Sequence, residues 1–266
     1  MNIVPISRAD APQIARYVNI KDRTVRGESM FIAEGELVTH RLAQSRYEIR
    51  SVFVDDNHLP VWEAIAQATA RQNVPVYAAP TPLLRSIVGY DFHLGIMAEG
   101  IRREESDFNL LLNDSFRRLV CLPACVKPDN LGSVFRSSAA LGVDGILLGM
   151  ESCDPLGRRT LRTSMGATLK MPWVRRDDIF QPLAELKQAG YKLVGTVLRS
   201  GAQNLNQFTW PDKTVLLLGN EYSGLSEDAI SACDYLITIP MSAGVDSLNL
   251  GVSAGVFLYA MRQEAK

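Results

Sequence analysis

The chain has 266 residues, of which 47% are hydrophobic and 21% are charged, and its 28 Lys and Arg nearly balance its 29 Asp and Glu. This composition is typical of a globular protein and excludes a disordered chain, a collagen-like chain and a coiled coil. No stretch reaches the roughly 18 apolar residues of a membrane span, so we expect neither a membrane segment nor a secretory signal. Four cysteines without a CxxC pair or a Cys/His cluster predict no disulfide framework and no metal site, and we expect a reduced, cytoplasmic protein.

The first hundred residues predict a small α/β unit, because short apolar runs alternate with helical patterns. The expected strands cover residues 30–33, 49–54, 74–77 and 94–98, and the expected helices cover 36–43 and 61–70. A charged run at residues 102–114 then interrupts the pattern. We place the domain boundary there, which gives one domain at residues 1–105 and a second at 116–266.

The second domain predicts an α/β fold with a mostly parallel sheet, because its strands are near-continuous apolar runs of the kind that helices cover on both faces. The expected strands cover residues 119–122, 145–148, 191–198, 214–218 and 235–239, and the expected helices cover 131–141, 179–188 and 248–261. The last helix is apolar or small on every side, which indicates burial against a partner subunit as well as against its own sheet.

Three polar clusters each follow a predicted strand, where ligands bind in parallel α/β sheets. In the first cluster, residues 127–136, Asn130 is a good helix N-cap, and Arg136 points away from the core with clearance left by Gly132. An arginine in that position suits a phosphate, and a plain surface arginine is the alternative.

The second cluster, residues 219–226, places Glu221 between two glycines, which lets the backbone approach a ligand closely, and a simple turn capped by Ser226 is the alternative. The third, residues 239–249, brings Ser247 and Asn249 to the opening of the apolar helix. Ser247 is a natural N-cap, whereas Asn249 would need a polar partner inside that helix.

Residues 153–176 carry six Lys and Arg against one Asp, so this basic block could neutralise several phosphates. A solvated surface is the alternative explanation.

Taken together, the three clusters resemble the signature motifs of the SpoU/TrmH branch of the SPOUT RNA methyltransferases. The motifs are N-x-G-x-x-x-R at 130–136, G-N-E-x-x-G-L-S at 219–226 and I-P-M…S-L-N at 239–249, and R-x-S-x-G-A at 162–167 resembles a further family element. The front part, with Arg26 and F-I-A-E-G at 31–35, resembles an L30e-like substrate-binding domain. The resemblance implies a SPOUT α/β domain with a deep trefoil knot, preceded by a small L30e-like α/β domain.

The resemblance also implies an S-adenosyl-L-methionine-dependent homodimer that methylates a ribose 2′-OH of RNA without a metal, with rRNA favoured over tRNA. Catalytic roles fall on Arg136, Asn130, Glu221, Ser247 and Asn249. Cofactor contacts fall on Gly219, Ile239 and Leu248, and also on Thr196 and Leu198. RNA contacts fall on Arg158, Arg159, Arg162 and Arg26.

Three alternatives remain at this stage: a tRNA methyltransferase, a non-catalytic knotted RNA-binding factor, and a nicotinamide-dependent enzyme that would lack the usual glycine fingerprint. The sequence also departs from the family pattern. Tyr222 stands where glycine is common, Gly251 where serine is common, and Leu94 where glutamine is usual.

Overall fold

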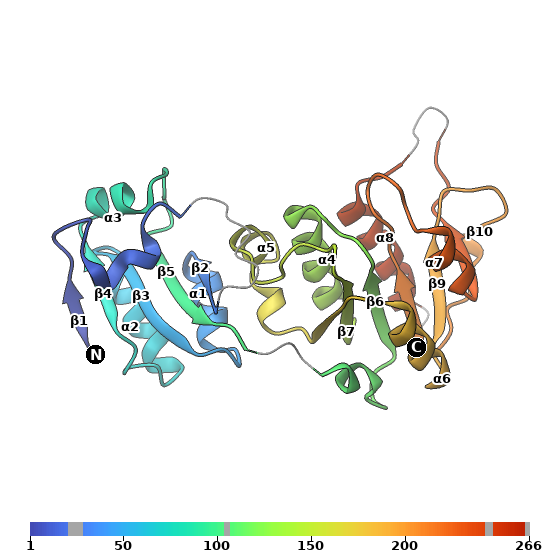
Figure 1. The fold of residues 1–266 in the computed structure, drawn as a ribbon, viewed down its shortest axis with the longest axis horizontal. Helices are drawn as coiled ribbons and strands as arrows, with labels where there is room; N and C mark the ends of the chain where they lie inside the picture. The colour runs from blue at the N-terminus through green and yellow to red at the C-terminus, as the bar shows by residue number, and fades with distance from the viewer. Residues whose placement is uncertain (21–28, 104–106, 243–246, 264–266) are drawn as a thin grey trace. The chain divides into compact units, whose positions relative to one another are not determined.

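The computed structural model describes residues 1–20, 29–103, 107–242 and 247–263 (Figure 1). The chain divides into two compact units. Unit 1 contains Met1–Glu104 and Asp154–Lys170, and unit 2 contains Glu105–Cys153 and Met171–Lys266. No helix in the described ranges is both long and apolar enough to cross a bilayer.

Unit 1 is built on a five-stranded mixed sheet with the order β1-β4-β3-β5-β2. The strands β1, β4 and β3 are parallel, whereas β5 runs antiparallel to both of its neighbours, β3 and β2. The strands are β1 (Ile3–Pro5), β2 (Met30–Glu34), β3 (Ile49–Asp55), β4 (Val76–Ala79) and β5 (Ile96–Ile101). The helices are η1 (Pro12–Tyr17), α1 (Glu36–Ala43), α2 (Leu59–Ala68) and α3 (Thr81–Val88). One cluster in its core packs Phe53 of β3 and Met97 of β5 against Leu84 and Ile87 of α3.

The segment Asp154–Lys170 packs with unit 1, although the expected second domain, 116–266, included it. It contains α5 (Arg158–Thr163) and the short turn η3 (Ala167–Leu169). The physical reason is the buried carboxylate of Glu34, which pairs with Arg158 and Arg162 at 3.2 Å each. A second ion pair joins Arg102 to Asp154.

Unit 2 contains a seven-stranded sheet with the order β10-β12-β9-β11-β6-β7-β8, and every described pairing in it is parallel. The strands are β6 (Arg118–Leu122), β7 (Gly145–Gly149), β8 (Trp173–Arg176), β9 (Lys192–Thr196), β10 (Gln203–Asn204), β11 (Thr214–Leu217) and β12 (Tyr235–Thr238). The helical segments are η2 (Phe108–Leu112), α4 (Pro128–Leu141), α6 (Phe180–Gln188), η4 (Leu205–Gln207), α7 (Glu227–Ala232) and α8 (Leu250–Gln263). This architecture confirms the expected α/β fold with a mostly parallel sheet.

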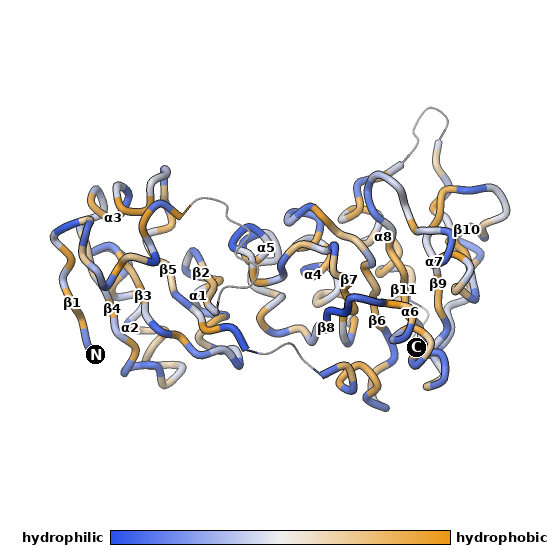
Figure 2. The backbone as a smooth tube through the Cα atoms, viewed as in Figure 1, coloured by the Kyte–Doolittle hydropathy of each residue, from blue (hydrophilic) through white to orange (hydrophobic). Residues whose placement is uncertain are grey.

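The central strands of unit 2 are mostly hydrophobic, as Figure 2 shows for β6, β7 and β11, and all residues of β7 and β11 are buried. Burial on both faces explains why the sequence shows continuous apolar runs rather than alternation. It also leaves the polar residues to the loops at the strand ends.

Helices α4 and α8 pack closely against each other. A Cβ added at Gly251 would lie 2.7 Å from the Cβ of Ser133, so the absence of a side chain at Gly251 allows this approach. Another side of α8 is exposed. Its large side chains Val252, Val256 and Tyr259 are 54%, 39% and 57% exposed. The described chain therefore leaves an apolar stripe of α8 uncovered.

Candidate active site

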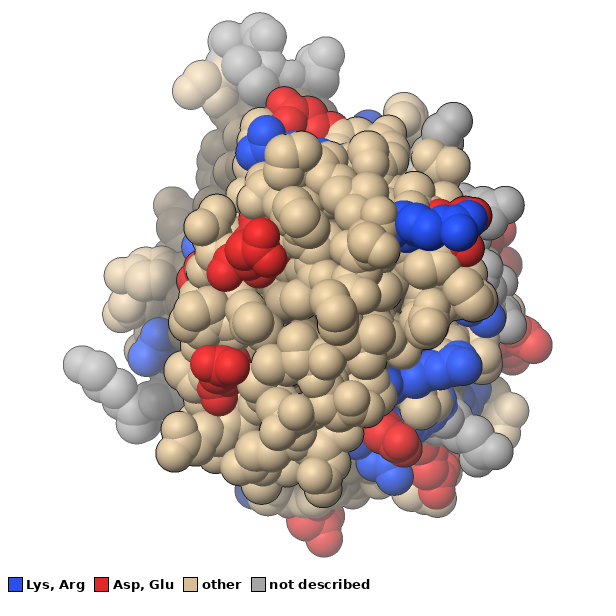
Figure 3. Space-filling model, turned by 90° about the vertical axis from the view of Figure 1, so that its left-hand side faces the viewer, with Lys and Arg blue, Asp and Glu red and all other residues tan. Residues whose placement is uncertain are grey.

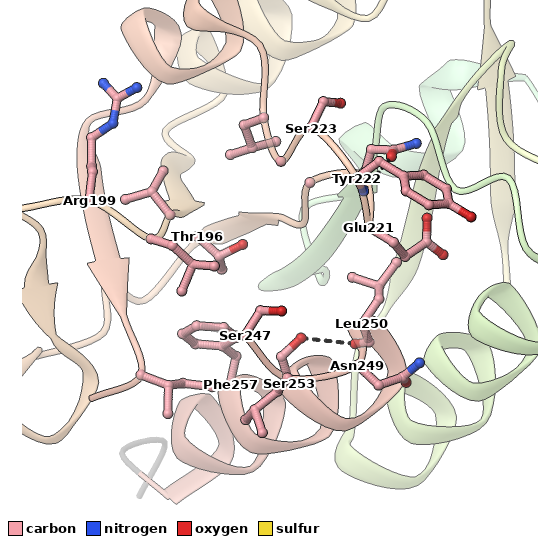
Figure 4. Close-up of a pocket in the computed structure, with 18 of the residues that line it drawn as sticks. Thr196, Arg199, Glu221, Tyr222, Ser223, Ser247, Asn249, Leu250, Ser253 and Phe257 are labelled. Atoms are coloured by element: carbon pink, nitrogen blue, oxygen red, sulfur yellow. Dashed lines mark hydrogen bonds between the residues drawn. The ribbon is translucent and has the colours of Figure 1, made fainter. Parts of the chain in front are cut away.

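A cavity of about 600 Å³ lies at the carboxyl ends of β9, β11 and β12 and at the start of α8 (Figure 4). This volume is typical of small-molecule sites. Its lining comes mainly from residues 196–199, 219–225, 239 and 241, and 247–250, all within unit 2. The second and third polar clusters therefore meet at one site, as the rule for the carboxyl ends of parallel strands predicts.

The loop after β11 is held rigidly against the sheet. Asn220 and Gly224 exchange two backbone hydrogen bonds of 2.9 Å each, and the Asn220 side-chain amide donates to the Ala124 carbonyl at 2.9 Å. Gly224 has a φ of +68°, in the left-handed region that favours glycine. At Gly219, a Cβ would lie 2.4 Å from the backbone of Gly224, so the loop can close only with glycine there.

A chain of amide and carboxylate groups connects the three clusters. The amide nitrogen of buried Asn130 donates to Glu221 Oε1, and Asn130 Oδ1 accepts from Asn249 Nδ2 at 3.0 Å. The other carboxylate oxygen, Glu221 Oε2, is buried and accepts no hydrogen bond from any described residue. A buried carboxylate oxygen is costly to leave unsatisfied, so this atom marks a place for a donor from outside the described chain.

Two capping predictions are wrong. Helix α4 begins at Pro128, so Asn130 lies in its first turn rather than before it. Proline suits this first position because its missing N–H is not needed there. In α8 the residue before the helix is Asn249, whose Oδ1 accepts from the Gly251 N–H at 2.9 Å as an N-cap does. Asn249 therefore caps the helix that Ser247 was expected to cap.

The five residues expected to contact the cofactor all line the cavity, and so do Glu221, Ser247 and Asn249. The cofactor set is Gly219, Ile239, Leu248, Thr196 and Leu198. Thr196 is fixed by its hydroxyl, which donates to the Leu217 carbonyl at 3.1 Å.

Arg136 is not part of this lining. It is exposed on α4, six residues after Asn130, and its neighbour Ser137 faces Gly255 of α8. Within the described part of a single chain, the expected catalytic arginine and the cavity are thus separate.

The residues expected to contact RNA differ in how accessible they are. The Arg158 side chain is 11% exposed, pairs with Glu34 and lies over the Tyr90 ring at 4.7 Å. Arg162 also pairs with Glu34 but is 48% exposed, and Arg159 is exposed. Arg26 lies outside the described residues. Arg158 therefore has little surface to offer to RNA, whereas Arg159 and Arg162 have more.

Sequence reasoning assigned no role to Lys127, Arg199 and Tyr222, which are exposed and line the cavity. Arg199 forms an ion pair with Glu227. The signal for Tyr222 was its departure from the glycine common in the family motif. The described residues contain no group of three or more His, Cys, Asp or Glu that could hold a metal ion.

Comparison with known proteins identifies the family. Residues 117–259 match the model of the SpoU rRNA Methylase family. The chain belongs to this family. An uncharacterized tRNA/rRNA methyltransferase of Mycobacterium tuberculosis is 31% identical over 236 residues, covering 88% of this chain and 81% of that protein.

Two further comparisons describe how far this SpoU family member resembles proteins with named activities or solved structures. The 23S rRNA (guanosine-2′-O-)-methyltransferase RlmB of Acinetobacter baylyi is 28% identical, covering 79% of this chain and 86% of RlmB. An AdoMet-bound rRNA methyltransferase of Sinorhizobium meliloti shares the fold, with a TM-score of 0.84, 24% identity and 99% coverage of both chains.

Proposed function

We propose that this SpoU family member transfers a methyl group from S-adenosyl-L-methionine to a ribose 2′-OH in rRNA. The observation that carries the proposal is the network of Asn130, Glu221 and Asn249, which joins the three family motifs beside a cavity of small-molecule size. The similarity to RlmB, a protein named for 2′-O-methylation of 23S rRNA, supports both the chemistry and the substrate.

The residues around the cavity fit S-adenosyl-L-methionine. The volume of about 600 Å³ is adequate, and Gly219, Ile239 and Leu248 line the cavity, as do Thr196 at the end of β9 and Leu198 just after it. The partnerless Glu221 Oε2 adds an acceptor and a negative charge beside the cavity. When bound, the cofactor supplies an activated methyl group, so the transfer requires no metal.

The protein has two tasks in this reaction. It orients the ribose, and it assists transfer of the hydroxyl proton to solvent water while the carbon–oxygen bond forms and the carbon–sulfur bond breaks to leave a neutral thioether. Glu221 and Asn249, with Ser247 beside them, hold the hydroxyl and the loops, and Asn130 fixes both partners. The guanidinium of Arg136 offers five N–H donors and no acceptor. Its role is therefore to bind the adjacent phosphate and to stabilise negative charge that develops on the oxygen.

We further propose that the active form is a homodimer. The exposed stripe of Val252, Val256 and Tyr259 on α8 supports this, because it is an apolar surface without a cover in the described chain. In such a dimer, Arg136 of one protomer would serve the cavity of its partner. This arrangement would supply the catalytic group that a single chain does not bring to its cavity.

The domain roles complete the proposal. Residues 1–105, together with the segment Asp154–Lys170, serve as an L30e-like RNA-binding domain, and the rest of residues 116–266 serves as a knotted, dimerising methyltransferase domain. Arg26 and the exposed Arg159 and Arg162 contribute to RNA binding, whereas Arg158 holds its segment through Glu34. On the face of unit 1 seen in Figure 3, Lys and Arg are sparse and lie towards its edges, so we do not assign RNA to that face. The four cysteines are free, in keeping with a cytoplasmic location.

A methylation assay tests the proposed function. The purified chain is incubated with tritiated S-adenosyl-L-methionine and either rRNA or tRNA from cells that lack the corresponding gene, and 2′-O-methyl positions are mapped. We expect labelling of rRNA at one defined ribose. Labelling of tRNA alone would show that tRNA, and not rRNA, is the substrate. The name of the mycobacterial relative, a tRNA/rRNA methyltransferase, keeps this alternative open. No labelling and no calorimetric binding of the cofactor would favour a non-catalytic RNA-binding factor.

A further inference from the structure

The side chain of Tyr222 lies at the apex of the loop after β11 and is 77% exposed. Tyr222 contributes to the loop through its backbone. The Tyr222 N–H donates to Asn220 Oδ1 at 2.8 Å, a hydrogen bond that any residue but proline could make. Tyr222 lines the cavity, and Figure 4 shows its ring beside Glu221. The fold therefore presents a large aromatic ring to solvent at the edge of the proposed methyl-transfer site without needing that ring for its own stability.

Lys127 stands next to this ring. Its ammonium nitrogen lies 4.7 Å from the ring centroid, within the range of a cation–π contact. A hydrogen bond with the Tyr222 side chain raises the pKa of Lys127 above its ordinary value. Lys127 comes from the residue before α4, and Tyr222 comes from the loop after β11. Two separate elements thus place a cation and an aromatic ring together on the same edge of the cavity.

An exposed aromatic ring beside a cation matches the chemistry of a nucleotide. Every base has a π-face that can stack on an aromatic ring, and such stacking tolerates different base identities. Lysine supplies the complementary charge for the phosphate that follows the base. The ring is held on a loop that two backbone hydrogen bonds and the Asn220 side chain fix in place, so little order is lost when a base binds.

We propose that Tyr222 and Lys127 form a nucleotide-binding subsite that stacks one RNA base and contacts its phosphate, and thereby positions the target ribose at the cavity. The inference rests on the proposed function and adds a positioning element for the RNA. Stacking of a base on the Tyr222 ring is a contact that a glycine at this position could not make.

Steady-state methylation of the rRNA from gene-deficient cells tests the subsite. In Tyr222→Leu, which keeps apolar bulk but removes the π-face, we expect the KM for rRNA to rise about tenfold, the size of one lost base–aromatic stack. In Tyr222→Phe, which keeps the ring, we expect KM within about twofold of the wild type. The kcat and the calorimetric affinity for S-adenosyl-L-methionine should stay unchanged in both.

A lysine pair supplies the matched control. Lys127→Gln should raise KM for rRNA and lower the slope of log KM against log salt by about one unit. Lys192→Gln removes an exposed lysine at the other end of β9 and should change neither.

Three outcomes would overturn the inference: an unchanged KM in Tyr222→Leu, an equal defect in Tyr222→Phe, or weaker binding of S-adenosyl-L-methionine in Tyr222→Leu. The last result would place the ring in the cofactor site instead. If the wild type methylates neither rRNA nor tRNA, the proposed function fails, and the subsite is judged by filter binding of rRNA to the wild type and Tyr222→Leu. Equal affinities would then overturn it.

Discussion

Asn130 shows what can and cannot be predicted at the scale of single residues. The three polar clusters could be assigned to one site because each follows an apolar strand, and Glu221, Ser247 and Asn249 do lie together. The partners of Asn130 could not be predicted, because they depend on whether α4 starts at Pro128 or at Leu131, a shift of three residues. That shift turns Asn130 from a backbone cap into a side chain that bridges Glu221 and Asn249.

Removing the Asn130 amide should impair both the fold of the site and its activity. In Asn130→Ala, Glu221 Oε1 loses its donor while it remains near the cavity, and the free energy of unfolding should fall by about 1–3 kcal/mol. Methyl transfer should fall at least tenfold, because Glu221 and Asn249 lose their common anchor. Chemical denaturation and a methylation assay measure the two effects. Asn204→Ala, an exposed asparagine in β10, is the control and should alter neither. Wild-type activity in Asn130→Ala would show that the network does not organise the site.

At the scale of elements, the long apolar segments could be predicted, whereas several short elements could not. The expected strands and helices all appear, with ends shifted by a few residues. The helices and strands that the sequence did not indicate are α3, α5, α7, β1, β8 and β10. Helix α5 is the clearest case, because its sequence R-R-T-L-R-T carries three arginines that look like solvated surface. Its position depends on Glu34, more than a hundred residues away, and local patterns carry no information about such a partner.

Neutralising Glu34 should release the segment Asp154–Lys170 from the rest of unit 1. Glu34→Gln keeps the shape but leaves the Arg158 guanidinium, whose side chain is 11% exposed, without its carboxylate. Breaking a buried ion pair from one side costs about 3–5 kcal/mol, and the half-exposed Arg162 adds little to this. We expect faster amide hydrogen exchange across residues 154–170, measured by mass spectrometry. Glu36→Gln, at an exposed glutamate two residues later, is the matched control. Equal exchange in the two variants would contradict the anchoring role of Glu34.

At the scale of the whole molecule, the sequence indicated a partner subunit from the apolar character of residues 248–261. Part of that helix is covered by α4 within the same chain, and the remaining stripe of Val252, Val256 and Tyr259 is exposed. A charge in the centre of this stripe should prevent the proposed dimer, because an unpaired carboxylate is costly to bury. Val256→Asp should therefore be a monomer by light scattering and folded by circular dichroism. It should show little methyl transfer in the methylation assay. Leu37→Asp, at an exposed leucine of unit 1, should leave the oligomeric state unchanged. A monomeric wild type would refute the dimer directly.

The composite site makes a sharper prediction, because Arg136 is absent from the lining of its own cavity while Glu221 is part of it. Arg136→Ala and Glu221→Gln should each be nearly inactive when alone. When the two variants are co-expressed with different tags, half of the dimers are mixed, and each mixed dimer has one site with both an intact Arg136 and an intact Glu221 if the arginine acts across the interface. The mixture should then recover about a quarter of wild-type activity, as expected for an isologous dimer with two equivalent sites. If Arg136 acts within its own chain, both sites of the mixed dimer lack one group, and no activity returns. Affinity purification through both tags isolates the mixed dimers, and the methylation assay then separates the two outcomes. If Arg136 acts in the cavity of the partner, every mixed dimer has one active site, and otherwise it has none.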